Sequence, residues 1–151
     1  MKTLLLTASS GGHLEQLMTL KKKLKDKYNI FVITEKTQYA KEEENTFFVK
    51  QLNRKSFLFP FKFIKNHFKI KKIIKKINPD VVVSTGALCT ISTCWIAHKK
   101  HKKVIFIESF AKVNSPTMTG KVVHKFADEF IVQWPEMLKV YPDAKYFGGI
   151  Y

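Results

Sequence analysis

The residues best suited to chemistry lie in a glycine-rich turn near the amino terminus, Ser9-Ser10-Gly11-Gly12-His13. The apolar run Lys2–Leu6 before it predicts a buried strand. N–H groups at a helix start have no partner within the helix, and glycines let a phosphate or a sugar approach them closely. His13 can donate to an anion or accept from a hydroxyl, although a plain strand-to-helix turn remains the alternative. A helix after the turn is predicted from apolar residues at helical spacing: Leu14, Leu17, Met18, Leu24 and Tyr28.

A carboxylate and two small turns are expected near this site. Glu108 follows the apolar run 104–107, and Ser109 and Phe110 come after it. Thr85 and Gly86 end the strand-and-turn stretch 79–86. In open α/β sheets, ligands bind at the carboxyl ends of the strands, so these residues are expected at one ligand-binding edge. For Glu108, a structural hydrogen-bonding role is the alternative.

The elements that must position these residues alternate along the chain. We expect strands at 2–6, 30–34, 46–52, 79–84, 104–107 and 129–134, with helices at 14–28, 60–77, 87–99, 115–126 and 135–141. The polar stretch 35–45 is expected to be a loop or a short helix. This order predicts an α/β fold with a doubly wound, Rossmann-like parallel sheet, in a single domain spanning residues 1–151.

Residues 54–77 differ from the rest of the chain, with nine Lys or Arg, five Phe and no acid. On a helical projection, Phe63, His67, Ile70, Ile74 and Ile77 form a core face. Lysines lie opposite, flanked by a second apolar stripe, as an interfacial membrane contact requires. A core helix with a solvated lysine face is the alternative. The predicted membrane-contact residues are Phe57, Phe59, Phe61, Lys62, Ile64, Lys65, Phe68 and Lys69.

Composition limits the function classes. The net charge of +15 indicates an anionic partner, either a nucleic acid, an acidic membrane or a phosphorylated substrate, although solvated lysines explain part of it. Cys89 and Cys94 lack metal-ligand spacing and are expected to be reduced core residues, so no metal site is predicted. The apolar start is too short for a signal peptide, and Ser84-Thr85-Gly86 interrupts the uncharged stretch 81–97, so no transmembrane helix is expected.

Four stretches together resemble one family: Ser9-Ser-Gly-Gly-His-Leu14, Pro79–Gly86, Ile105–Phe110 with Thr119-Gly-Lys121, and Val132–Pro135. The chain is similar over nearly its whole length to the membrane-associated subunit of two-component GT-B UDP-sugar transferases. Bacterial members are capsular and exopolysaccharide proteins of the PssD and CpsF kind. The eukaryotic counterpart anchors the transferase that adds the second N-acetylglucosamine to dolichyl-pyrophosphate. The chain is also similar, more distantly, to the N-terminal half of the MurG transferase.

The resemblance implies a division of labour. The chain would be the N-terminal domain of a GT-B enzyme and would bind a polyprenyl-pyrophosphate-linked sugar acceptor. A separate donor-binding subunit would bind the UDP-sugar, so no cofactor is expected on this chain. The protein would be peripheral, on the cytoplasmic face of the membrane, and attached through residues 54–77, because the membrane anchor of the eukaryotic counterparts is not seen before Lys2.

The resemblance also implies residue roles. His13 and Glu108 would face the cleft, with His13 positioning the substrate and Glu108 as the carboxylate for orientation or base work; either could reach the acceptor hydroxyl. The predicted acceptor-binding residues are Ser10, Gly11, Gly12, His13, Thr85, Gly86, Ser109 and Phe110.

Two other function classes remain open. A nucleic-acid-binding protein would use the positive charge and the phenylalanines, but no RNA-binding or helix-turn-helix signature supports it, and no nucleic acid is expected as a partner. A complete small Rossmann-type enzyme would use a nucleotide alone, and tight UDP or dinucleotide binding by the isolated chain would favour it.

Overall fold

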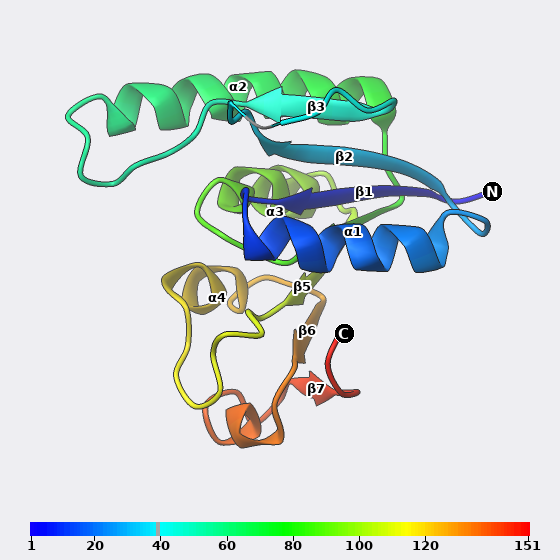
Figure 1. Cartoon of the computed structure of the whole chain (residues 1–151), viewed down its shortest axis with the longest axis vertical. Helices are drawn as coiled ribbons and strands as arrows, with labels where there is room; N and C mark the ends of the chain where they lie inside the picture. Colours follow the sequence, from blue (N-terminus) through cyan, green and yellow to red (C-terminus); the bar gives the residue numbers. More distant parts are fainter. Residues whose placement is uncertain (39) are drawn as a thin grey trace.

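The computed structural model describes residues 1–38 and 40–151, and in this part of the chain the strands form one parallel, seven-stranded sheet (Figure 1). The strand order is β3-β2-β1-β4-β5-β6-β7, so the order reverses between β1 and β4. The predicted doubly wound, Rossmann-like fold is confirmed. The strands are β1 (Thr3–Ala8), β2 (Asn29–Glu35), β3 (Thr46–Val49), β4 (Val81–Ser84), β5 (Lys103–Ile107), β6 (Glu129–Val132) and β7 (Lys145–Tyr146).

Successive side chains along a strand point to opposite faces of the sheet. Both faces are apolar, and helices cover both of them. Leu5 lies in the core under α2 (Phe59–Ile77), α3 (Thr90–Lys99) and α4 (Met118–Val123). Leu4 and Leu6 lie in a second core, under α1 (Gly12–Leu24). Cys89 and Cys94 are buried and not disulfide-bonded, as predicted, and burial raises the pKa of the Cys94 thiol to about 12.

Helix α2 has the predicted core face. Ile70 and Ile74 are buried, and the side chain of His67 contacts the Ser92 hydroxyl on α3 at 3.2 Å. Asn66 is also buried, which the helical projection did not predict. Its side-chain amide accepts from Lys50 N at 2.9 Å and donates to Lys50 O at 2.7 Å, just beyond the edge strand β3.

The second apolar stripe of α2 faces solvent. Phe61 is 68% exposed, Ile64 54% and Phe68 59%, and Phe57, which lies just before the helix, is 90% exposed. Two predicted membrane-contact residues are less exposed than expected. The ring of Phe59 packs against Phe63 one turn later, with centroids 5.9 Å apart, and Lys62 is half-buried beside the loop that precedes the helix.

The orientation of α2 follows from the topology. The helix connects the parallel strands β3 and β4, so it runs antiparallel to them. Its amino-terminal end therefore lies on the side of the molecule where β1 ends and α1 begins (Figure 1). The exposed Phe57 and Phe61, at the start of α2, and the carboxyl edge of the sheet therefore share one end of the molecule.

Some predicted boundaries are wrong. Helix α4 begins at Met118 rather than Ser115, with Thr117 as its N-cap, and the helix predicted at 135–141 is a 3₁₀ helix, η1 (Pro135–Lys139). Strand β7 was not predicted, because two exposed residues carry no pattern. The predicted loop or short helix at 35–45 includes Tyr39, which lies outside the described residues. No helix in the described part of the chain is both long and apolar enough to cross a membrane.

Candidate functional site at the carboxyl edge of the sheet

The turn after β1 and the turn after β4 are joined by hydrogen bonds at the point where the strand order reverses. Ser9 N donates to Gly86 O at 2.9 Å. The Thr85 hydroxyl donates to His13 O at 2.8 Å, and His13 Nδ1 lies 2.6 Å from Thr85 O. The structure therefore brings together three of the predicted residues, His13, Thr85 and Gly86, with the turn that begins α1, at the position where open α/β sheets bind ligands.

The bond to Thr85 O determines which nitrogen of the neutral His13 ring carries the proton. A carbonyl oxygen can only accept, so Nδ1 must carry the proton. In the neutral ring, Nε2 is then an acceptor, and it has no hydrogen-bond partner among residues 1–38 and 40–151. The half-buried imidazole can therefore accept a hydrogen bond from a hydroxyl group.

Gly86 is required beside this ring. Its φ of +93° is unfavourable for other residues, and a Cβ there would lie 3.2 Å from both Cε1 and Nδ1 of His13. Thr85 is fully buried, and its hydroxyl is committed to His13 O. Thr85 therefore holds the histidine, and the prediction that it contacts the acceptor does not fit this geometry.

Glu108 is buried, with 1% exposure, and its carboxylate accepts four hydrogen bonds. Oε1 accepts from Ser109 N at 2.9 Å and from the Thr117 hydroxyl at 2.8 Å. Oε2 accepts from Thr117 N at 3.1 Å and from the Tyr141 hydroxyl at 3.3 Å. These bonds hold the loop 109–117 and the start of α4.

The expectation that Glu108 faces the cleft is therefore wrong. The side chain turns inward because N–H and hydroxyl donors from Thr117 and Tyr141 surround it. The Thr117 hydroxyl also accepts from Gly120 N at 2.8 Å, which caps α4. This geometry matches the structural alternative, and burial, followed by the nearby carboxylate, raises the pKa of the Tyr141 phenol.

Ser109 and Phe110 stabilise the same loop, which follows Glu108. Ser109 is buried, and its hydroxyl accepts from Ala111 N at 3.3 Å. The half-buried Phe110 ring packs against Trp134, with centroids 4.9 Å apart, and Phe110 O accepts from the Trp134 indole at 2.6 Å. Both polar groups thus stabilise the loop, and the Phe110 ring remains partly accessible.

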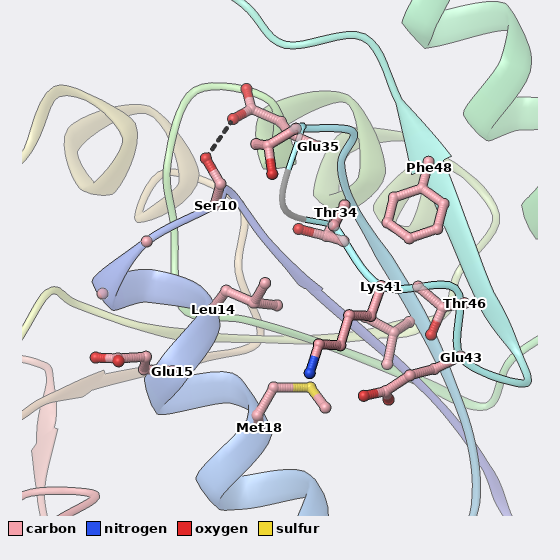
Figure 2. Close-up of a pocket in the computed structure, with 15 residues that line it drawn as sticks. Ser10, Leu14, Glu15, Met18, Thr34, Glu35, Lys41, Glu43, Thr46 and Phe48 are labelled. Atoms are coloured by element: carbon pink, nitrogen blue, oxygen red, sulfur yellow. Dashed lines mark hydrogen bonds between the residues drawn. The ribbon is translucent and has the colours of Figure 1, made fainter.

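Next to the turn of α1 lies a cavity of about 650 Å³ (Figure 2). The predicted residues Ser10, Gly11 and Gly12 line one side of it. The opposite side is formed by residues of β2, by residues of β3 and by four residues between these strands. The cavity is lined by Ser10, Gly11, Gly12, Leu14, Glu15, Met18, Val32, Thr34, Glu35, Thr37, Ala40, Lys41, Glu43, Thr46 and Phe48.

Glu35 is a second buried carboxylate at this edge, and it is not among the predicted site residues. It is the last residue of β2 and only 6% exposed, and it accepts from Leu52 N at 3.1 Å and from the Ser10 hydroxyl at 3.4 Å. After burial, its carboxylate is the largest cause that raises the pKa of the Cys89 thiol. The signal was available, because the rule that singled out Glu108, a carboxylate at the end of an apolar strand, also applies to Glu35.

Comparison with known proteins identifies a family. The family profile described as "Oligosaccharide biosynthesis protein Alg14 like" matches residues 49–150. The UDP-N-acetylglucosamine transferase subunit ALG14 of Kluyveromyces lactis is 35% identical over 77 residues, which are 47% of this chain and 33% of that protein. The human ALG14 subunit is 24% identical over 178 residues, covering 98% of this chain and 82% of that protein. The chain spans about a third of the length of the yeast relatives it matches.

Solved structures share the fold. MurG of Acinetobacter baumannii superposes with a TM-score of 0.72 at 17% identity, over 89% of this chain and 42% of that one. UDP-N-acetylglucosamine 2-epimerase of Rickettsia bellii superposes with a TM-score of 0.78 at 10% identity, over 99% of this chain and 45% of that one. The family profile extends from the end of β3 to Ile150 and so covers most of the chain. The protein therefore belongs to the Alg14-like family of oligosaccharide biosynthesis proteins.

Proposed function

We propose that this protein is the accessory, acceptor-binding subunit of a UDP-sugar glycosyltransferase. In this proposal it presents a polyprenyl-pyrophosphate-linked sugar to a separate donor-binding subunit, which supplies the UDP-sugar. The relatives support the first part, because they are named as subunits of a UDP-N-acetylglucosamine transferase. Assembly of a capsular polysaccharide or an exopolysaccharide is the proposed setting.

The arrangement at the strand-order reversal carries the proposal. The bond between His13 Nδ1 and Thr85 O leaves Nε2 as a hydrogen-bond acceptor. Beside it lie the N–H groups of the Gly11-Gly12 turn, where α1 begins. A helix start favours negative charge, so these N–H groups suit a pyrophosphate. The imidazole suits a hydroxyl that must lose a proton. A second domain that closes over this edge would align both reactants, and such alignment can lower the barrier by roughly 7–11 kcal/mol at best.

The outer stripe of α2 supports a membrane location, which we propose to be peripheral and on the cytoplasmic face. Phe57, Phe61, Ile64 and Phe68 are exposed, and lysines flank them. Each Lys near an anionic bilayer contributes about 1 kcal/mol. Because this stripe begins at the end of the molecule that carries the His13 turn, a lipid-linked acceptor would meet the site without leaving the bilayer (Figure 1).

Transfer to a lipid-linked acceptor by the chain co-purified with its donor-binding subunit tests the catalytic proposal. His13→Ala should lower the rate at saturating UDP-sugar by about a hundredfold or more, which is the scale of general acid–base catalysis. Thr85→Val should lower the rate less, because it removes the hydroxyl bond that holds His13 O while the imidazole and its bond to Thr85 O remain. An unchanged rate for His13→Ala, with the partner still bound, would refute the catalytic role of His13.

Co-sedimentation with anionic liposomes tests the membrane proposal. Replacing the exposed Lys65, Lys69 and Lys72 with Gln should release the protein, whereas the same change at the exposed Lys22, Lys25 and Lys27 should not. Equal loss of binding in both triple variants would mean that net charge, rather than the α2 surface, attracts the protein.

A further inference from the structure

A second cavity, of about 580 Å³, lies at the carboxyl edge of the sheet beside the start of α2. The loop that leads from β3 into α2 forms most of its lining (Figure 1). Three cations, Arg54, Lys55 and Lys62, line it together with the amides of Gln51 and Asn53. No carboxylate of the described residues is part of this lining, so the cavity is basic throughout.

The three cations of this cavity have no acidic partner. None of them forms an ion pair within residues 1–38 and 40–151, and residues 45–79 contain no Asp or Glu. Glu35 accepts from Leu52 N in the same loop at 3.1 Å, but it does not line the cavity. Like charges that share a small space repel one another, and an anion bound between them would remove this repulsion.

Arg54 is the only arginine in the chain, and its guanidinium is weakly engaged. Its Nη1 donates to Met118 Sδ at 2.6 Å, and a thioether is a weak acceptor. A guanidinium presents five N–H donors in a planar fork that fits two phosphate oxygens at once. Because exchanging a thioether for a phosphate costs little, Arg54 is suited to bind a phosphate group.

The loop that carries these cations is ordered by its own hydrogen bonds. Asn53 Oδ1 accepts from Lys55 N at 3.0 Å, and Asn53 O accepts from Ser56 N at 3.0 Å. The cations are therefore positioned by backbone and amide contacts rather than by ion pairs. An entering anion has no ion pair to break.

Exposed apolar side chains next to the cavity indicate what kind of phosphate fits. Lys62 N donates to Leu58 O at 3.0 Å, so Leu58 lies one turn before Lys62, and Phe61 directly precedes it. Leu58 is 52% exposed, and Phe61 is among the exposed residues described above. A free phosphate gains nothing from such neighbours, whereas a phospholipid carries acyl chains next to its phosphate diester. An anionic cavity ligand with apolar chains therefore fits best.

We infer that this cavity binds the phosphate diester of an anionic phospholipid, with Arg54 as the bidentate donor and Lys55 and Lys62 as further cations. The acyl chains lie over Leu58 and Phe61. The inference deepens the proposed membrane attachment, on which it rests for the orientation of α2 toward the bilayer. It adds recognition of one headgroup to the general attraction that the outer lysines of α2 supply.

Titration of the isotope-labelled 151-residue chain with dihexanoylphosphatidylglycerol, kept below its micelle-forming concentration, tests the inference by NMR. The amide signals of Asn53 and Leu88 and the Nε–H signal of Arg54 should shift saturably. Dihexanoylphosphatidylcholine and inorganic phosphate should each bind about tenfold more weakly, because the first adds a cation and the second lacks acyl chains.

Two variants separate phosphate recognition from net charge. Arg54→Lys keeps the charge but loses the planar fork, so it should weaken binding of the phosphatidylglycerol about 5- to 10-fold. Lys71→Gln is the matched control, because it removes a whole charge from an exposed position on α2 that does not line the cavity. It should change binding by less than about twofold, since exposed charges are screened. Both positions are exposed, so both variants should keep the parental melting temperature.

Each outcome decides. Weaker binding by Arg54→Lys, with near-parental binding by Lys71→Gln, supports the phospholipid site. Parental binding by Arg54→Lys, equal weakening in both variants, or equal binding of the two lipids overturns it. Inorganic phosphate that binds as tightly as the phosphatidylglycerol also overturns it and assigns the cavity to free phosphate. Shifts of the same signals by geranyl diphosphate alone overturn it and assign the cavity to the acceptor.

The titration uses neither vesicles nor the partner subunit, so it separates this inference from the proposed function. A chain that binds the soluble phosphatidylglycerol but not anionic liposomes would refute the proposed membrane attachment and leave the phosphate site standing. A chain that needs the α2 lysines for liposome binding, but shows no saturable shifts at the cavity, would refute the phosphate site alone.

Discussion

Two buried carboxylates at the same edge of the sheet have different surroundings. Glu35 ends β2, and Glu108 follows β5 directly. Glu108 accepts two backbone N–H bonds and two hydroxyl bonds, all from side chains and loops that enclose it. Glu35 accepts one backbone bond and one long hydroxyl bond, and it borders a cavity (Figure 2).

This difference shows that position at the carboxyl edge does not by itself make a ligand-binding residue. The number of donors supplied by the protein decides what a carboxylate can still do. Glu108 is saturated and therefore stabilises the fold, whereas Glu35 accepts fewer hydrogen bonds and lines a cavity. The following predictions test this contrast.

Gly120→Ala should have the largest effect on stability. A Cβ at this position would lie 2.1 Å from Glu108 Oε2 and 2.9 Å from Thr117 Oγ1, so the saturated carboxylate must move. We expect a loss of about 3 kcal/mol in the free energy of unfolding, measured by urea denaturation. Gly12→Ala is the control, because a Cβ there meets no atom within 4 Å. Equal stability of the two variants would show that Glu108 is not tightly enclosed.

Glu108→Gln should follow in size. The amide replaces one acceptor oxygen with a donor, which then faces the N–H or hydroxyl groups of Thr117 and Tyr141. A loss of about 2 kcal/mol is expected, because a buried donor is left unpaired. A variant of parental stability that transfers sugar slowly would instead make Glu108 part of the reaction, as the sequence predicted.

Glu35→Gln should destabilise the fold less, by about 1 kcal/mol. One amide oxygen can still accept from Leu52 N, and the new NH₂ group can turn toward the cavity. The comparison with Glu108→Gln, under the same denaturation conditions, measures the difference between the two sites. A loss as large as that of Glu108→Gln would mean that Glu35 is also a structural carboxylate.

Tyr141→Phe should have the smallest effect, about 0.5 kcal/mol near neutral pH, from one long hydrogen bond to Glu108. Burial and the carboxylate raise the pKa of Tyr141 above its ordinary value of 10.0. The folded protein thus holds the phenol proton more tightly than the unfolded chain, so this stability is complete below pH 10.0 and declines as the pH rises through the raised pKa. The difference between parent and variant should therefore shrink in alkaline denaturation series, and a constant difference would contradict it.

Much of the fold could be predicted because its signals are local. The buried valines of β4 and the spacing of Ile70 and Ile74 in α2 are short-range patterns, and the structure confirms both. The predicted start of α4 is wrong because the position of its N-cap, Thr117, depends on a hydrogen bond to Glu108. Contacts between residues far apart in the sequence are not visible as a periodic pattern.

The candidate site was predicted only in part for the same reason. The glycines and His13 are adjacent in the sequence, and the structure brings them to the expected edge. The burial of Glu108 depends on Tyr141, and that of Glu35 depends on Leu52, both from other parts of the chain. Glu35 was also missed because its neighbours are polar, so that it looked like the start of a solvated loop.

The two hydrogen bonds between Asn66 and Lys50 also affect how readily the protein aggregates at high concentration. β3 is an edge strand, and unpaired backbone groups at a sheet edge can template the strand of another molecule. The Asn66 amide occupies both the N–H and the C=O of Lys50, so a foreign strand cannot extend its pairing past the end of β3. Proteins collected on a membrane reach high local concentrations, where edge-to-edge aggregation is favoured. The helix proposed to bind the bilayer thus also limits self-association there.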